Sequence, residues 1–334
     1  MRKAIITLAI VVLGLISGCN RTATPSEKKL FLNVDFKEAD TLRYKFVSSK
    51  DIELDWDPSN MSPKTRSKGG KSKSTEYFEM VVGYTPISVD AYGLTTIQAK
   101  CESVKIHRTP AQKGSDNDAA TNFEGKTFTF IVTPTGKFED RSQLEKLVKE
   151  VAQKAFHKHP KLGRIKEPEM ILDFIATQWF LWDSVSSIEK PLDGLETGQS
   201  WESVLSVPNP TMLRRARQVT YQLREIRKTP NGRIAVISST YTPAEAAPKS
   251  WPSPFDGRFQ VSGTFGFLIS FVKGFDMVGL EGQGEELFNI DTGMTENYKQ
   301  QYQARFAGTE PMSLGIQPQI TINQKLTMQI LPKK

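Results

Sequence analysis

Residues 219–241 read VTYQLREIRKTPNGRIAVISSTY and carry the clearest structural signal in the chain. Apolar and polar side chains alternate from Val219 to Leu223, which is the pattern of a half-buried strand. Pro230-Asn231-Gly232 follows, a combination typical of a tight turn. The apolar run from Ile234 to Tyr241 then returns as a partner strand. The sequence therefore predicts an antiparallel β-hairpin in this stretch.

Similar strand patterns occur on both sides of a central region, which favours a strand-rich body over residues 30–334. Polar loops at 58–74 and 109–122 separate some of them. A faint internal echo, in which a strand runs into Thr135-Gly136 and again into Thr292-Gly293, predicts two related halves at 30–140 and 195–334. The predicted strands lie at 42–46, 52–56, 77–82, 88–92, 94–106, 128–132, 259–271, 284–290, 298–306 and 320–330.

The central region 141–190 has helical periodicity. An apolar stripe at helical spacing runs from Leu144 to Phe156, with a capping box at Ser142 and Glu145. A second, largely apolar helix is predicted to begin at Pro168. We therefore predict an α+β fold, mainly antiparallel β, in which curved sheets pack on a two-helix central insert.

The N-terminus has the layout of a secretory signal peptide. Arg2 and Lys3 precede an uncharged apolar run from Ala4 to Ile16. That run is short for a membrane span, which needs about 20 residues. The small residues Ser17 and Gly18 come next, directly before Cys19, and are suited to a cleavage site.

Ile16-Ser17-Gly18-Cys19 resembles the lipobox of bacterial lipoproteins. The resemblance implies a signal peptide at 1–18, lipid attachment at Cys19, and a membrane as the partner of that anchor. Residues 19–29 are then expected to form a flexible tether. Asn20 follows the cysteine, and this favours the outer membrane, facing the periplasm, if the host has two membranes.

The body is similar only loosely to uncharacterised strand-rich envelope lipoproteins. Its predicted plan resembles, at the level of fold, the half-barrel-on-helix architecture of lipoprotein carriers.

Composition and cysteine usage restrict the function classes further. The 334 residues carry a net charge of +7, and removing Arg2 and Lys3 with the signal peptide lowers it to +5. This mild excess, with both signs interspersed, gives no support for nucleic-acid binding. Lipidation of Cys19 would leave Cys101 without a disulfide partner, so we expect Cys101 to be a buried thiol.

Four carboxylates at every second position, Asp51, Glu53, Asp55 and Asp57, share one face of a predicted strand. Such a row could bind a hard cation, but it lacks the turn that makes calcium ligands converge. The alternative is a solvated strand face beside the basic loop, and the polar–apolar alternation favours it. The histidines do not have the spacing of metal ligands, so no metal site is predicted.

No catalytic residue or cofactor site is predicted. Ser187 and Lys190 fit a Ser-x-x-Lys pattern without the companion motifs of a known enzyme class. Gly282-Gln283-Gly284 is not followed by the helix that a phosphate loop requires. A set of aromatic residues could line a groove for lipid or glycan, although such residues more often build a core. They are Trp179, Trp182, Trp201, Trp251 and Phe255.

Two function classes therefore remain. The first is a non-enzymatic binding or structural lipoprotein whose partner is a lipid, a glycan or an envelope protein, and it predicts an apolar groove. The alternative is an envelope hydrolase, which predicts a pocket where Ser, Asp or Glu converges with Lys190 or a histidine.

Overall fold

The structure is a computed structural model. It describes residues 29–55, 71–109, 119–136, 190–207, 215–245, 274–309 and 318–333, with shorter pieces at 138–140, 142–143, 146–147, 150, 156–157, 163–165 and 259–261.

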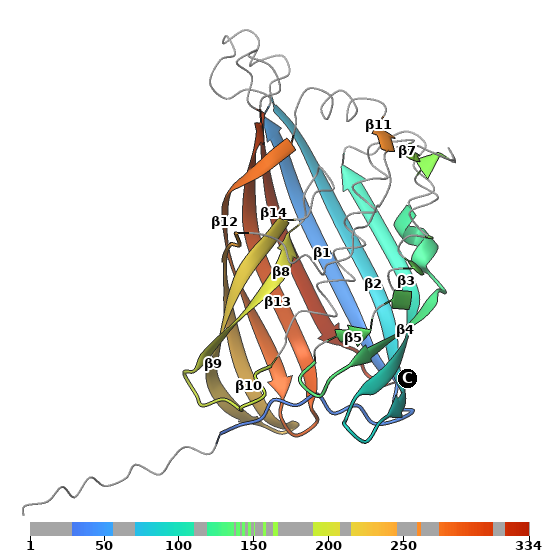
Figure 1. The fold of residues 1–334 in the computed structure, drawn as a ribbon, viewed down its shortest axis with the longest axis vertical. Helices are drawn as coiled ribbons and strands as arrows, with labels where there is room; N and C mark the ends of the chain where they lie inside the picture. Colours follow the sequence, from blue (N-terminus) through green and yellow to red (C-terminus); the bar gives the residue numbers. More distant parts are fainter. Residues whose placement is uncertain are drawn as a thin grey trace, which may run out of the picture.

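The described residues form a large antiparallel sheet and a small mixed one, in which β11 pairs parallel with β7. The large sheet has 11 strands in the order β5-β4-β3-β2-β1-β14-β13-β12-β10-β9-β8, and the small one has the order β11-β7-β6 (Figure 1). A short 3-10 helix, η1, spans Ala119–Phe123. The strands are β1 (Leu42–Asp55), β2 (Lys71–Val89), β3 (Thr95–Thr109), β4 (Thr127–Val132), β5 (Phe138–Asp140), β6 (Phe156–His157), β7 (Gly163–Ile165), β8 (Ser200–Val207), β9 (Arg215–Thr229), β10 (Gly232–Pro243), β11 (Phe259–Val261), β12 (Gly274–Asn289), β13 (Met294–Thr309) and β14 (Gln319–Ile330).

The large sheet consists of two meanders joined in the middle. Strands β1 to β5 are neighbours in chain order, and so are β8, β9, β10, β12, β13 and β14. The two sets meet where β1 pairs antiparallel with β14, from Tyr44 opposite Ile330 to Asp55 opposite Gln319. We call this pairing the seam. Both strand-rich segments of the sequence therefore lie in one sheet, while their relation by duplication stays a prediction.

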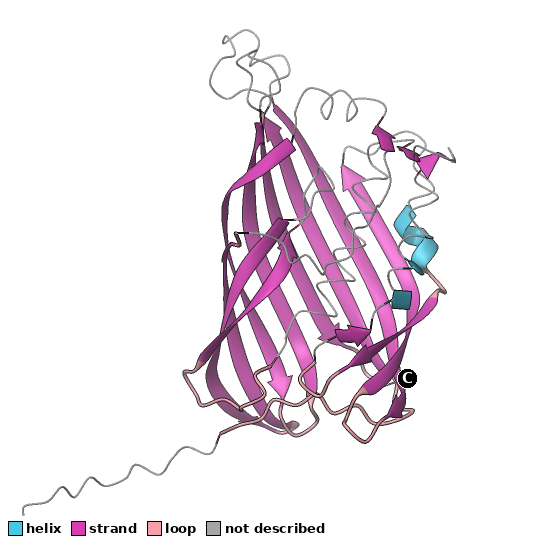
Figure 2. Ribbon diagram, viewed as in Figure 1, coloured by secondary structure: helices cyan, strands magenta, loops and turns pink. Residues whose placement is uncertain are grey.

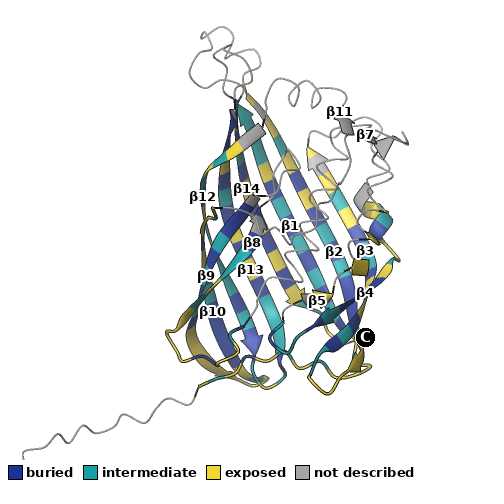
Figure 3. Cartoon of the chain, in the orientation of Figure 1, coloured by how far each residue is buried: buried dark blue, intermediate teal, exposed yellow. Residues whose placement is uncertain are grey.

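The sheet is curved and buries one face. Alternate residues of β1 and β14 are buried, and those between them are largely more exposed (Figure 3). Phe130 on β4 and Phe288 on β12 line the same cavity although several strands separate them in the sheet order. The buried face is therefore the inner face of the curve, and the polar face is the outer one.

The hairpin predicted from residues 219–241 is confirmed. β9 and β10 pair antiparallel, with Thr229 opposite Gly232 across the two-residue turn Pro230-Asn231. Gly232 has φ of 121°, a conformation that glycine adopts without the strain of a side chain. Asp291 accepts a hydrogen bond from the backbone N–H of Arg233 and pairs with its guanidinium, which ties this turn to the next one.

The predicted α+β architecture is wrong. The part of the chain that the structure describes is antiparallel sheet almost throughout, with no helix of seven or more residues (Figure 2). Within the first predicted helix, the described residues Ser142, Gln143, Lys146, Leu147 and Glu150 are helical, and Leu147 is buried in the core. The predicted stripe does not stay helical to its end, because Phe156 belongs to β6, whose backbone pairs with β7. The long strands on both sides set the fold class, since their backbone groups satisfy one another in a single sheet. The second predicted helix lies outside the described residues.

The described tight turns gather at one end of the large sheet, the lower end in Figure 1, which we call the turn end. Residues 29–41 run across this end before β1 begins, and we call them the closing segment. Leu30 forms an isolated antiparallel bridge with Leu195, and Leu32 is buried in the core. The closing segment is therefore packed against the sheet before its first strand starts.

A search of the described residues for a helix long and apolar enough to span a bilayer gives no candidate.

Cys101 on β3 is a buried free thiol, as predicted, and only 2% of it is exposed. Burial raises the pKa of the Cys101 thiol to about 12, and the nearby carboxylate of Glu124 adds to the shift. Because the thiolate is the reactive form, we expect native Cys101 to react with a disulfide reagent at pH 8 about 1,000-fold more slowly than in urea. Labelling kinetics of a Cys19→Ser variant would measure this, and equal rates in both states would contradict it.

Candidate functional site: an apolar cavity with a buried ion pair

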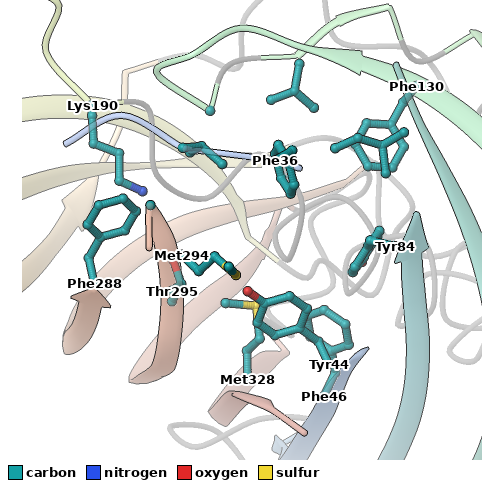
Figure 4. A pocket seen from close by; sticks show the side chains of 15 residues that line it. Phe36, Tyr44, Phe46, Tyr84, Phe130, Lys190, Phe288, Met294, Thr295 and Met328 are labelled. Atoms are coloured by element: carbon teal, nitrogen blue, oxygen red, sulfur yellow. The ribbon is translucent and has the colours of Figure 1, made fainter. Parts of the chain in front are cut away.

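An apolar cavity of about 120 Å³ opens on the inner face near the turn end (Figure 4). Strands from both halves of the sheet and the closing segment contribute most of its wall, so it forms only when the two halves are assembled. The lining side chains are mainly aromatic, aliphatic and thioether groups: Val34, Phe36, Tyr44, Phe46, Tyr84, Ile97, Phe130, Val132, Phe288, Met294 and Met328, with Lys190 and Thr295.

Aromatic contacts hold the wall of the cavity on one side. Phe46 lies edge-on to Tyr84 with ring centroids 6.5 Å apart, and Tyr84 lies edge-on to Phe130 at 6.0 Å. Tyr44 packs on Phe46 and Tyr84 as well, at 6.3 and 6.0 Å. Offset and edge-to-face pairs at these separations are favourable, so this wall is a fixed surface contributed by β1, β2 and β4.

The closing segment supplies the wall at the turn end. The Val34 N–H donates to the carbonyl of Pro134 at 2.7 Å, and the Asp35 N–H donates to the carbonyl of Gly293 at 3.1 Å. Val34 and Phe36 line the cavity, while Asp35 between them contacts the β12–β13 turn. Gly293 is required there, because a Cβ at that position would collide with the Asp35 backbone.

A buried ion pair lies at the polar end of the cavity. Lys190 Nζ is 3.3 Å from Glu286 Oε1, and the two side chains are only 4% and 1% exposed. Lys190 Nζ also lies over the Phe288 ring, 4.9 Å from its centroid. Burial lowers the pKa of Lys190, and the Glu286 carboxylate opposes this shift. Lys190 and Thr295 therefore line the cavity as polar groups, and Glu286 lies beside them as the counter-ion of Lys190 without lining it.

Among the described residues, the two oxygens of the Glu286 carboxylate differ in their hydrogen bonds. Thr295 donates its hydroxyl hydrogen to Oε1, the same oxygen that Lys190 contacts. Oε2 is buried and has no hydrogen-bond partner among the described residues. Burial raises the pKa of the Tyr44 hydroxyl, and the charges of Glu286 and Glu296 raise it further. Glu286 therefore acts electrostatically on a residue of the cavity wall.

A second polar cluster crosses the inner face on β9, β10 and β13. Arg217 is fully buried, and its Nη2 donates to Gln300 Oε1 at 2.9 Å. Its guanidinium lies over the rings of Tyr241 and Tyr302, at 5.1 and 4.8 Å from the centroids. Tyr298 donates its hydroxyl hydrogen to the same Gln300 oxygen at 2.8 Å. Cation–π contacts and hydrogen bonds thus accommodate the guanidinium inside the sheet.

The polar cluster continues to the seam and ends in a second buried ion pair. The Tyr302 hydroxyl donates to Gln324 Oε1 at 2.7 Å, and Gln324 Nε2 donates to Ser48 Oγ at 3.1 Å. Lys50 and Glu76 pair at 3.2 Å, with 6% and 5% of their side chains exposed. Neither of these last two residues lines the cavity, so the pair offers an internal control for the Lys190–Glu286 pair.

The acidic row predicted on the first strand faces lysines. Glu53 Oε2 is 2.9 Å from Lys73 Nζ, and Lys71 Nζ lies 3.1 Å from Glu53 and 3.3 Å from Asp55. Hydrogen bonds from Lys73 and Lys71 lower the pKa of Glu53. These ion pairs account for Glu53 and Asp55, while Asp57 lies outside the described residues. No group of three potential metal ligands occurs in the described residues.

Glu79 on the outer face gives a pH-dependent prediction. Hydrogen bonds from Lys45 at 2.8 Å, and from Tyr77 and Lys105, lower the pKa of Glu79 to about 2. A carboxyl whose pKa is lower when folded stabilises the fold above its unfolded pKa, here 4.5, and loses this contribution as pH falls towards 2. We therefore expect Glu79→Gln to lower the free energy of unfolding at pH 7 and by progressively less below pH 4.5.

Urea titrations at several pH values would measure the difference between Glu79→Gln and the wild-type chain. A difference that is equal at pH 7 and pH 2.5 would contradict the prediction.

The other residues singled out from the sequence fall in different places. Trp201 stacks on Tyr221 with centroids 5.2 Å apart and packs against the core. Lys190 lies in the cavity, but Ser187 is outside the described residues, as is Cys19. The remaining aromatic candidates, Trp179, Trp182, Trp251 and Phe255, are outside them too.

Sequence reasoning missed Glu286, Arg217, Gln300 and Gln324. A signal for the two glutamines existed, because each occupies the inward phase of a strand between large apolar residues. Gln300 stands between Tyr298 and Tyr302, and Gln324 between Ile322 and Leu326. A polar residue at a core position of an alternating strand indicates either a buried network or a site.

Comparison with known proteins does not assign a family. No protein-family model and no curated protein matches the sequence. A structure of lipovitellin, from work on lipid–protein interactions in that protein, is similar to this chain with a TM-score of 0.43. The sequence identity is 9%, over 89% of this chain and 26% of that one. A mutant of the Rh. blastica porin has a TM-score of 0.17 and 6% identity over 86% of this chain and 100% of that one.

This chain thus spans about a quarter of the lipovitellin chain. Scores this low carry no argument about function, so a function for this protein has to be inferred from the geometry of the cavity.

Proposed function

We propose that this protein is a non-enzymatic, lipid-binding lipoprotein of the bacterial cell envelope, whose cavity holds hydrocarbon of a lipid. The observation that supports it most directly is the unfilled space of about 120 Å³ between aromatic, aliphatic and thioether side chains. Protein interiors are close-packed and leave few voids larger than a water molecule. An apolar cavity of about 150 Å³ in another protein stays dry and binds benzene, so a cavity of this size suits a short stretch of hydrocarbon.

The proposal includes attachment to a membrane through Cys19, by preference the outer membrane facing the periplasm. Lys29, where the closing segment begins, is the tenth residue after Cys19. A fully extended chain of that length reaches about 35 Å. The closing segment also lines the cavity. An anchor at Cys19 would therefore keep the turn end, and with it the cavity, within that distance of the membrane surface. This proximity suits a protein that takes up or delivers a membrane lipid.

Binding of octyl compounds to the full chain tests the proposal. We expect saturable heat of binding with 1-octanol in isothermal titration calorimetry. We expect the heat to be lost in Val132→Phe, because the larger side chain fills the cavity from β4. The matched control is Val47→Phe, the same exchange on the outer face of β1, which should bind as the wild-type chain does.

No saturable binding of any octyl compound to a folded wild-type chain would refute lipid binding. Equal binding by Val132→Phe and the wild-type chain would place the octyl site elsewhere.

One observation favours the alternative of an envelope hydrolase. Glu286 converges with Lys190 and with the hydroxyl of Thr295 at the cavity, which is the kind of arrangement expected for it. An enzyme of this kind would hydrolyse p-nitrophenyl octanoate with saturation, and Thr295→Val would abolish turnover. Binding of octanol without turnover of the ester would favour the carrier.

A further inference from the structure

We propose that the cavity selects a lipid with a neutral head group that accepts a hydrogen bond, such as a primary alcohol, over a carboxylate or an ammonium. This inference rests on the proposed function and concerns the polar end of the same cavity. The juxtaposition that carries it is a lysine that lines the cavity, Lys190, whose charge is balanced from behind the wall by the buried Glu286 carboxylate.

The charges at the polar end of the cavity are balanced. Lys190 and Glu286 are one cation and one anion at 3.3 Å, and both are at least nine-tenths buried. A further charge brought beside them would have no counter-charge in the pair and would be taken out of water. A ligand ion beside this pair would lie close to both of its charges. A carboxylate would be repelled by Glu286, and an ammonium would be repelled by Lys190. The balanced pair therefore disfavours either ionic head group.

Hydrogen-bonding capacity remains on the lysine that lines the cavity. The Lys190 ammonium has three N–H donors, of which one is directed to Glu286 Oε1. Glu286 is not a lining residue, and its Oε1 receives the Thr295 hydroxyl as well. A hydroxyl oxygen can accept a hydrogen bond from an ammonium. An alcohol thus matches the donor group that lines the cavity, whereas a hydrocarbon end does not.

The polar end of the cavity is also held in place by its neighbours. The backbone N–H of Lys190 donates to the carbonyl of Thr135 at 3.0 Å, and the Phe288 ring supports the ammonium. Phe288 lies opposite Thr295 across β12 and β13. The donor and its counter-ion are therefore fixed by three neighbouring segments before any ligand enters.

Calorimetry with 1-octanol, octanoate and octylammonium at pH 7 tests the inference on the full chain. We expect octanol to bind about tenfold more tightly than either ion, since one hydrogen bond to a buried charged group has about this effect. Tighter binding of octanoate or octylammonium would overturn the inference, and so would equal binding of all three. In those cases lipid binding itself would stand, whereas failure of every compound would refute the proposed function and this inference together.

Single substitutions are expected to change the order in opposite directions. Glu286→Gln leaves the Lys190 cation without its carboxylate, so octanoate should become the tightest of the three. Lys190→Met leaves the Glu286 anion, so octylammonium should become the tightest. An unchanged order in both folded variants would refute the role of the pair.

The double variant Lys190→Met/Glu286→Gln serves if a single variant does not fold, because it carries no unpaired buried charge. It should bind octanol about tenfold more weakly than the wild-type chain, and undiminished octanol affinity would overturn the inference. The matched controls are Lys50→Met and Glu76→Gln in the other buried pair, which should leave the order of the three compounds unchanged.

Discussion

Phe46→Ala is expected to lower the free energy of unfolding by about 3–5 kcal/mol, the usual cost of removing a buried phenylalanine ring. Phe46 is fully buried on β1, contacts Tyr44 and Tyr84, and lies opposite Met328 across the seam. The loss is large against a total stability of about 5–15 kcal/mol. Because Phe46 also lines the cavity, the same change should enlarge the cavity and admit longer alkyl chains.

Urea denaturation followed by circular dichroism would measure the stability, and calorimetry with decanol would measure the second effect. Val47→Ala is the neighbouring control on the outer face and should cost far less. A loss of less than about 1 kcal/mol for Phe46→Ala, well under the usual cost, would show that the aromatic wall contributes little to the stability of the core.

Leu326→Pro is expected to prevent the two halves of the sheet from joining. Leu326 is buried on β14 with β1 on one side and β13 on the other, where it lies opposite Ser48 and Gln300. Proline removes a hydrogen bond from the ladder and is not accommodated in a central strand. Together with the lost leucine side chain, we expect a cost of at least about 3 kcal/mol.

Hydrogen exchange would show where the damage lies, since amides of both β1 and β14 should lose protection. Leu326→Val keeps the backbone donor and most of the apolar volume, so it should cost about 1 kcal/mol and leave the seam protected. A Leu326→Pro variant with normal protection along β1 would contradict the importance of the seam.

The strands were predictable because apolar and polar residues alternate along them and residues typical of turns separate several of them. The 219–241 hairpin is the clearest case, since Pro230-Asn231-Gly232 fixes the turn and the alternation of apolar and polar residues fixes the inward face. The helical insert was not predictable correctly from the apolar stripe, because a stripe reports one-sided burial but not its partner. The described residues of its first part, up to Glu150, are helical, whereas Phe156 at the end of the stripe lies in a strand that pairs with β7.

The cavity could not be derived from sequence patterns. It depends on which strands become neighbours, and the decisive neighbour pair, β1 with β14, is far apart in the chain. Lys190 stands out in the sequence through a Ser-x-x-Lys pattern and as a possible partner of a Ser, Asp or Glu, but no pattern identifies that partner as Glu286, 96 residues away. Local sequence patterns show which residues of a strand face inward. They do not show which residues of other strands lie next to them across a curved sheet.

The seam also sets an order of events during biogenesis. β1 is among the first segments to leave the ribosome, but its partner β14 emerges only after the residues up to 318. Until then one edge of β1 has no strand to pair with, and open edges recruit other chains. Pairing across so long a separation is also slow. The partly synthesised chain is thus the form most prone to aggregation. Pairing with the C-terminal strand β14 covers the open edge of β1 and ends this exposure.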